Sequence, residues 1–189
     1  MGLDFVVRPS DCDESWHPGE APVDYAARVA RAKLEACPRA DGERRLAADT
    51  TVWTVSDGAP LGKPATRDEA RAMLRELEAV GTHQVTTAYA HDAERGVVVA
   101  EVTTRVTFRA LGPAELERYL DTDEWRDKAG GYGIQASAAS FVSRVEGSYT
   151  NVVGLPLAEL SAWLVAGATE VDAEVDGEVD ADVDAEVGA

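Results

Sequence analysis

The stretch that decides the fold is THQVTTAYAHDAERGVVVAEVTTRVTFRAL, residues 82–111. Both halves are dense in Val and Thr, which are β-branched and favour strands. Only the short segment AERG, residues 93–96, connects them. Two such runs with a short connection predict an antiparallel hairpin, and the other elements are placed on either side of it.

Three elements are expected between the N-terminal region and this hairpin. PVDYAARVARAKLEAC, residues 22–37, has Pro in its first turn and apolar side chains at helical spacing, so it predicts a helix. RLAADTTVWTV, residues 45–55, is rich in β-branched residues and predicts a strand that ends at the turn SDG. Residues 66–80 predict a second helix with Thr66 as its N-cap. The opening LDFVVRP, residues 3–9, reads as a short strand.

Helices and strands also alternate after the hairpin. A short helix is expected at 112–122, a last strand at 139–147 and a closing helix at 155–167. The predicted fold class is α/β (mixed α+β), with a mixed central β-sheet flanked by helices. We expect one domain over residues 1–167 and a disordered acidic tail over residues 168–189.

The charge of the chain is concentrated in that tail. The net charge is −17, and nine acids between Glu170 and Glu186 alternate with small residues; without these nine the charge is −8. Like charges on one face repel and Val, Ala and Gly bury little, which favours a solvated, disordered segment. Weak Ca²⁺ binding is the alternative, although the spacing is not that of an EF-hand. Nucleic acid is not an expected partner of so acidic a chain.

Cysteine and histidine usage argues against disulfides and zinc. Cys12 and Cys37 form no C-x-x-C motif, and they are expected to be reduced thiols of a cytoplasmic protein. The three histidines, His17, His83 and His91, lack the spacing of metal ligands. No apolar run reaches membrane-spanning length, so no membrane association is expected.

Three polar residues are candidates for a site. Asp49 lies within a predicted strand, where Asp is disfavoured, so it either caps a local backbone group or has a chemical role. Lys63 is held between Gly62 and Pro64, and the alternative is a solvated turn lysine. Glu14 ends the acidic cluster SDCDES, for which the alternative is an exposed loop.

A glycine-rich loop completes this set of features. DKAGGYGIQA, residues 127–136, has more glycines than a turn requires and ends near Gln135, which is not a turn residue. Carboxylates, lysines and such a loop suit a site for Mg²⁺ and phosphate, because Mg²⁺ prefers oxygen ligands and lysines neutralise phosphate charge. The residues alone indicate a phosphate-ester or nucleotide site.

The sequence resembles the Maf family of nucleoside triphosphate pyrophosphatases from about Gly2 to Leu164. The resemblance is carried by motifs that occur in the family's order and approximate spacing: SDCDES, VARAKLEA, AADTTV, LGKP, THQVTTA, TRVTFR, DKAGGYGIQ and FVSRVEGSYTNVVGLPL. It implies a Maf/ITPase-like fold with a central cleft, often a homodimer. It also implies a cytoplasmic enzyme that cleaves a nucleoside triphosphate between the α- and β-phosphates with a divalent metal, Mg²⁺ or Mn²⁺.

The resemblance also implies roles for particular residues. Asp49 matches the proton acceptor that activates water, and it is expected to contact the metal together with Glu14. Matches to substrate-binding positions are Lys33 and Lys63 for phosphate, Thr50 and Gln135 for substrate choice, and Lys128 in the glycine-rich loop.

The loop GGYGIQ resembles the branch of the family that acts on dTTP and UTP. Glycines allow the backbone to approach a flat ring, and the amide of Gln135 can complement a pyrimidine edge. The expected partner is therefore a pyrimidine nucleoside triphosphate. Ala136 stands where the family usually has Gly.

The N-terminal S-x-S-P-R-R segment of the family, whose arginine and backbone bind phosphates, has no counterpart in this sequence. A start codon assigned too late, a natural short form and a chain completed by a partner are the three explanations. We expect the chain as given to be much less active than a version extended upstream. The alternative function is a weakly active or inactive nucleotide-binding protein related to septum formation.

Overall fold

The computed structural model describes residues 4–55 and 58–175, with side chains as far as residue 166. The chain divides into two compact units. One is Val7–Ala158, which contains the whole sheet, and the other takes in Met1–Val6 and Glu159–Ala189.

A five-stranded antiparallel sheet forms the centre of the first unit. Its strands are β1 (Leu46–Trp53), β2 (Pro60–Leu61), β3 (Thr82–Ala93), β4 (Gly96–Phe108) and β5 (Val142–Glu146), in the order β2-β1-β3-β4-β5. The predicted α/β class is confirmed. The sheet was expected to be mixed, but each of the four pairings among the described strands is antiparallel.

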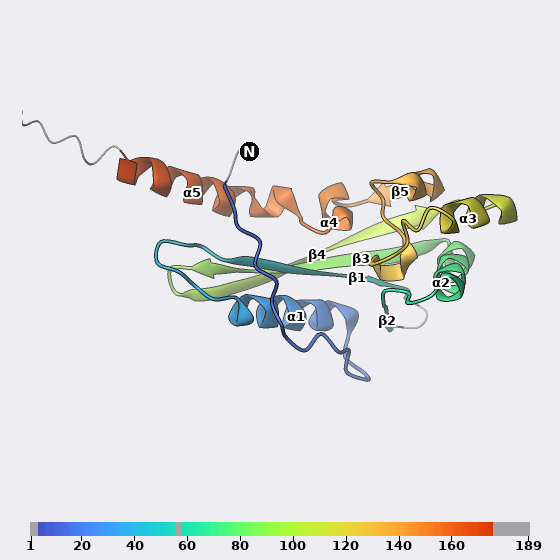
Figure 1. Cartoon of the computed structure of the whole chain (residues 1–189), viewed down its shortest axis with the longest axis horizontal. Helices are drawn as coiled ribbons and strands as arrows, with labels where there is room; N and C mark the ends of the chain where they lie inside the picture. The colour runs from blue at the N-terminus through green and yellow to red at the C-terminus, as the bar shows by residue number, and fades with distance from the viewer. Residues whose placement is uncertain (1–3, 56–57, 176–189) are drawn as a thin grey trace, which may run out of the picture. The chain divides into compact units, whose positions relative to one another are not determined.

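The predicted hairpin at residues 82–111 is confirmed as β3 and β4, the two longest strands (Figure 1). They pair without interruption from Thr82 opposite Thr107 to Ala93 opposite Gly96. Gly96 has a φ of 118°, which the tight connection requires and which glycine adopts at little cost. β1 pairs along the other side of β3, so β3 lies in the middle of the sheet.

The two predicted N-terminal helices are also confirmed. α1 (Pro22–Ala36) packs on β3, where small side chains on both elements allow close approach. The buried residues of this contact are Ala26, Ala30 and Leu34 from α1 and Ala88 and Ala90 from β3. α2 (Arg67–Val80) begins at Thr66, whose hydroxyl accepts a hydrogen bond from the backbone N–H of Glu69, as predicted.

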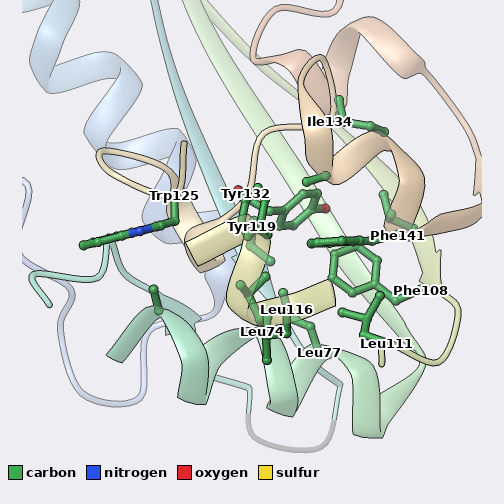
Figure 2. Close-up of a cluster of buried hydrophobic side chains, with 14 of the residues drawn as sticks. Leu74, Leu77, Phe108, Leu111, Leu116, Tyr119, Trp125, Tyr132, Ile134 and Phe141 are labelled. Carbon is green, nitrogen blue, oxygen red and sulfur yellow. The ribbon is translucent and has the colours of Figure 1, made fainter. Parts of the chain in front are cut away.

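A larger core lies between α2, α3 (Pro113–Leu120) and the end of the sheet. Figure 2 shows Leu74 and Leu77 of α2 below a group of aromatic rings that includes Tyr132 and Phe141. Both leucines are fully buried, and burial of each contributes about 1.5 to 3 kcal/mol. The two 3-10 helices η1 (Ala129–Gly131) and η2 (Ser137–Phe141) belong to the segment that closes over this core.

The last two helices follow β5. α4 (Tyr149–Val153) lies on the opposite side of the sheet from α1 (Figure 1). α5 (Leu157–Val175) includes the first residues of the predicted acidic tail, 168–175. The rest of that tail, residues 176–189, lies outside the described residues, so its predicted disorder stays a prediction.

One predicted strand is wrong. Residues 4–9 of the expected strand at 3–9 have no regular secondary structure. Val7 is 76% exposed, and the backbone of this segment pairs with none of the described strands. A short apolar run forms a strand only where a partner supplies hydrogen bonds and a face to bury, and none of the described strands pairs with these residues.

Candidate active site

A cavity of about 480 Å³ opens beside β1 and the glycine-rich loop. Six of the seven residues predicted for the site line it: Lys33, Asp49, Thr50, Lys63, Lys128 and Gln135. The seventh, Glu14, is joined to the cavity through its ion pair with Lys33. The apolar part of the wall includes Val52, Val85, Tyr132, Ile134, Val152 and Val153.

The open edge of β1 explains how neighbouring side chains reach one cavity. Successive side chains of a strand point to opposite faces of the sheet. Asp49 and its cross-strand partner Ala88 face α1, whereas Thr50 and its partner Thr87 lie on the other face. β2 pairs only with Val52 and Trp53, so the preceding part of β1 has β3 alone as its partner among the described strands. The cavity surrounds this edge, where both faces of the strand are accessible.

Lys33 holds the two predicted carboxylates together. Its Nζ atom lies 2.8 Å from Oδ1 of Asp49 and 2.9 Å from Oε2 of Glu14. Burial lowers the pKa of Lys33, but hydrogen bonds to the two carboxylates outweigh burial and the pKa is raised overall. Lys33 is therefore charged at neutral pH.

Asp49 has the electrostatic properties of a potential base. Only 11% of its side chain is exposed, and this burial raises the pKa of the carboxyl against the opposing effect of Lys33. A carboxylate with a raised pKa accepts a proton more readily than a solvated one, because its charged form is less stabilised.

Glu14 is positioned by its backbone as well as by Lys33. The hydroxyl of Tyr25 donates to the carbonyl oxygen of Glu14 at 2.9 Å, and Arg28 donates to the carbonyl oxygen of Ser15 at 2.7 Å. Arg28 is in turn fixed by two hydrogen bonds to Glu20. α1 therefore fixes the loop that carries Glu14, although 44% of the Glu14 side chain remains exposed.

The two other lysines of the cavity are available to a ligand. Neither Lys63 nor Lys128 forms a salt bridge within the part of the chain that the structure describes. Both line the cavity with Lys33. Three ammonium groups around one cavity favour a ligand with several negative charges.

The glycine-rich loop forms the opposite wall and is held from behind. Gly130 has a φ of 67°, and a Cβ atom there would lie 3.2 Å from Cγ1 of Val52. Tyr132 is anchored by its hydroxyl, 2.7 Å from Nε2 of the fully buried His83. Burial lowers the pKa of His83 to about 4, so the ring is neutral at pH 7. Gln135 follows this anchor and is exposed at the cavity.

Sequence reasoning missed two cavity residues with recognisable side-chain chemistry, Asp127 and Tyr132. Asp127 has a φ of 59°, a conformation that Asp adopts more readily than most residues. Tyr132 depends on the distant His83, which no local pattern reveals. Their place inside DKAGGYGIQA was the available signal.

Glu14 and Asp49 have the chemistry to hold a divalent cation. They converge on one cation already, the ammonium of Lys33. Mg²⁺ is commonly bound by one or two carboxylates, with substrate phosphates and waters as its other ligands. Among the described residues no group of three or more His, Cys, Asp or Glu side chains is arranged for a metal, so a cation here would need ligands from the substrate.

The cavity has an apolar wall, three lysines and the carboxylates of Asp49 and Asp127, with Glu14 joined to it through Lys33. This chemistry is that of a site able to bind a phosphorylated small molecule. The family model described as Maf-like protein matches residues 1–166, and the chain belongs to this family. The predicted family is confirmed, whereas the S-x-S-P-R-R prediction stays a prediction.

Curated relatives of this chain are named dTTP/UTP pyrophosphatase. The one from Hahella chejuensis is 48% identical over 164 residues, which are 84% of this chain and 80% of that protein. The one from Anaeromyxobacter dehalogenans strain 2CP-1 is 50% identical over 169 residues, 87% of this chain and 84% of that protein. The relative from Geobacter sulfurreducens is 46% identical, with coverage of 84% and 83%. Within the described residues, no helix has the length and apolar character needed to cross a membrane.

Proposed function

We propose that this protein is a nucleoside triphosphate pyrophosphatase that converts dTTP and UTP to the monophosphate and pyrophosphate. The names of the relatives support this substrate class. The observation that carries the proposal is the meeting of Lys33, Asp49 and Glu14 at a cavity of about 480 Å³ that Thr50, Lys63 and Gln135 also line.

Asp49 is the proposed general base. The oxygen of a water molecule attacks the α-phosphorus, and the Asp49 carboxylate accepts the proton that the water loses. The bond between the α-phosphorus and the oxygen that bridges to the β-phosphorus breaks, and pyrophosphate leaves with the electron pair. The raised pKa of Asp49 favours this proton transfer.

A divalent cation, Mg²⁺ or Mn²⁺, held by Glu14 and Asp49 would lower the pKa of water and neutralise phosphate charge. Lys33 supplies a fixed positive charge between the same carboxylates and keeps Asp49 ionised. Lys63 and Lys128, which have no salt bridge in the described structure, bind phosphate oxygens. These contacts hold the triphosphate so that its α-phosphorus lies near Asp49.

The base of the nucleotide lies on the loop side of the cavity in this proposal. Ile134 and Tyr132 provide apolar contact there, and the exposed amide of Gln135 offers a donor and an acceptor to a pyrimidine edge. The hydrogen bond between the Tyr132 hydroxyl and Nε2 of His83 keeps Tyr132 in place. The loop therefore contacts the base, while Asp49 on β1 and Lys33 on α1 supply the groups that act on the triphosphate.

Pyrophosphate release is the test. The wild-type chain would be assayed with Mg²⁺ and with EDTA on dTTP, UTP, CTP, GTP and 7-methyl-GTP, beside Asp49→Asn and Asp68→Asn. Asp68 is a control, because its side chain is 89% exposed on α2. We expect Mg²⁺-dependent turnover of dTTP and UTP, its loss in Asp49→Asn and its retention in Asp68→Asn.

A folded wild-type chain that binds UTP without hydrolysing it would contradict this proposal. The alternative, a nucleotide-binding protein without turnover, would then stand. Equal activity of Asp49→Asn and wild type would instead remove Asp49 from the mechanism and leave the substrate class intact.

A further inference from the structure

Thr50 shares a hydrogen bond whose direction decides what its side chain can offer a ligand. Thr50 lines the cavity, and its Oγ1 lies 2.8 Å from Oγ1 of Thr87 on β3. Either hydroxyl could be the donor in this contact when the two are considered alone. A hydroxyl has one proton and two lone pairs, so it can donate only one hydrogen bond at a time.

Asn151, which is hydrogen-bonded to Thr87, determines the direction of the bond between Thr50 and Thr87. Oγ1 of Thr87 also lies 2.9 Å from the backbone carbonyl oxygen of Asn151 in α4. A carbonyl oxygen can only accept, so the single proton of Thr87 is directed to Asn151. Thr87 must therefore accept in its contact with Thr50, and Thr50 must donate.

Asn151 is itself fixed in one orientation. Its Oδ1 accepts from the backbone N–H of Thr87 at 3.0 Å, and its Nδ2 donates to the carbonyl oxygen of Val85 at 2.9 Å. Nδ2 also donates to Oγ1 of Thr104 at 2.9 Å. Because the two backbone partners permit only one placement of the amide, it cannot be flipped without loss of both bonds.

These hydrogen-bonded residues are also shielded from water. Thr87, Thr104 and Asn151 have no exposed surface. A buried polar group that loses its partner carries a large penalty, so reversal of the hydrogen bonds is disfavoured. The direction of the bond from Thr50 to Thr87 is therefore a fixed property of the folded chain.

The family resemblance already implies a role for Thr50 in substrate choice. We infer that Thr87 and Asn151 fix Thr50 as a hydrogen-bond acceptor toward a donor group of the nucleotide. The hydroxyl proton of Thr50 points into the sheet, and the two lone pairs of the hydroxyl oxygen are left to accept from the ligand. This inference rests on the proposed function and deepens it. The donor is either the ring N3–H of uracil and thymine or a hydroxyl of the sugar.

An acceptor at this position also rejects the wrong ligand. Cytosine has a lone pair at N3 where uracil has N–H, so contact with Thr50 would bring two acceptors together. Sites that hydrogen-bond a substrate group discriminate against analogues that lack it. Thr87 and Asn151 are then positioning residues for specificity, although Thr87 itself does not line the cavity.

Thr87→Val is the main test, because valine keeps the shape and removes the acceptor. The carbonyl oxygen of Asn151 keeps the hydrogen bond from the N–H of Gly154 at 2.9 Å. Thr50 would then be free to turn its proton to the cavity. The matched control is Thr103→Val, which removes a cross-strand hydroxyl bonded to Thr86 at 2.8 Å, away from the cavity lining.

The values of kcat/KM would be compared for UTP, CTP and 2′,3′-dideoxy-UTP. If the ring N–H is the donor, the preference of UTP over CTP falls about fivefold in Thr87→Val, the size of one net hydrogen bond. If a sugar hydroxyl is the donor, the preference for UTP over the dideoxy analogue falls instead. Thr87→Ser and Thr103→Val should keep the wild-type ratios.

The inference is overturned if UTP is hydrolysed and neither ratio changes in folded Thr87→Val; the proposed function would survive that result. If Thr87→Val does not fold, Thr50→Val must lower one of the two preferences and Thr50→Ser must retain it. If the wild type hydrolyses no nucleotide, the proposed function fails. The ratios are then read from the dissociation constants of the non-hydrolysable α,β-methylene analogues, with the same two outcomes.

Discussion

The Nζ atom of Lys33 lies 2.8 Å from Oδ1 of Asp49, so a helix and a strand that are separated in sequence meet in one ion pair. Only 20% of the Lys33 side chain and 11% of the Asp49 side chain are exposed. Charges that are partly removed from water interact more strongly than surface charges. The pair therefore sets the protonation state of the proposed base.

Lys33→Met should move the acid limb of the pH profile of kcat/KM to higher pH. Asp49 must be ionised to accept a proton, and Lys33 opposes the rise of its pKa that burial causes. Without the ammonium, the pKa of Asp49 rises further, and Glu14 adds like-charge repulsion. We expect a shift of about one pH unit or more, measured by initial rates between pH 5 and 9 in constant ionic strength.

Arg31→Met is the control for this shift. Arg31 lies on the same helix and forms an exposed ion pair with Glu35 at 3.8 Å. Its removal changes the net charge by the same amount without a contact to the site, and its profile should match wild type. A shift of the Lys33→Met limb to lower pH, or equal shifts in both variants, would contradict the assignment of Asp49 as the base.

Gly130→Ala should destabilise the chain and raise KM. The φ of 67° is strained for alanine, and the added Cβ would lie 3.2 Å from Val52 and 3.4 Å from Leu77. The left-handed conformation alone costs about 1 to 2 kcal/mol in a residue with a side chain. Because the same loop carries Lys128 and Gln135, nucleotide binding should weaken too. Urea denaturation and steady-state kinetics measure the two effects.

Gly112→Ala is the matched control. Gly112 precedes α3 with a φ of −62°, and a Cβ there would meet nothing within 4 Å. The Gly112→Ala variant should have nearly the same midpoint of urea denaturation as the wild type. Were Gly130→Ala as stable as Gly112→Ala, the close packing of the glycine-rich loop on Val52 and Leu77 would be incorrect.

The buried His83 should make stability depend on pH between about 6.5 and 4. Burial lowers the pKa of His83 from 6.5 to about 4 in the folded chain. Above pH 6.5 the ring is neutral in both states, so His83 adds no pH dependence. As the pH falls below 6.5, the unfolded chain binds a proton that the folded chain does not, and the free energy of unfolding falls by up to about 3 kcal/mol.

His83→Gln isolates this effect from the carboxylates, which also titrate at acid pH. The difference in unfolding free energy between wild type and His83→Gln would be followed by urea denaturation from pH 7.5 to 4. We expect the difference to change steadily below pH 6.5 in the direction of wild-type destabilisation. A difference that stays constant over this range would show that His83 is accessible to protons in the folded chain.

The sequence predicted those parts of the structure that depend on local pattern. The hairpin of β3 and β4, the capped start of α2 at Thr66 and the Pro-initiated helix α1 follow from residue type and spacing within a single segment. The prediction of a strand at 3–9 was wrong because a strand needs a neighbouring strand to pair with, and sequence periodicity does not show whether one is present.

Some residues of the site were predictable from the sequence, whereas contacts formed only on folding were not. Asp49 and Lys63 were recognisable because an Asp within a predicted strand and a lysine between Gly and Pro are locally unusual. The resemblance to the Maf family added Lys33 and Thr50. The anchor of Tyr132 on His83 and the path from Thr50 through Thr87 to Asn151 depend on side chains brought together by folding, so no local pattern reveals them.

Tyr25→Phe should raise the metal concentration needed for activity more than it raises KM for the nucleotide. The Tyr25 hydroxyl is 2.9 Å from the carbonyl oxygen of Glu14 and helps to fix the loop that carries this carboxylate. Loss of one such hydrogen bond is worth about 1 kcal/mol, or about fivefold in an equilibrium constant. The concentration of Mn²⁺ needed for half-maximal activity should rise by that factor, while KM for UTP at saturating Mn²⁺ changes less. Tyr149→Phe, at an exposed position on α4, should match wild type in both measurements. If the Mn²⁺ requirement of Tyr25→Phe is unchanged while Glu14→Gln raises it, Lys33 and Arg28 are sufficient to position Glu14 and the Tyr25 contact is dispensable.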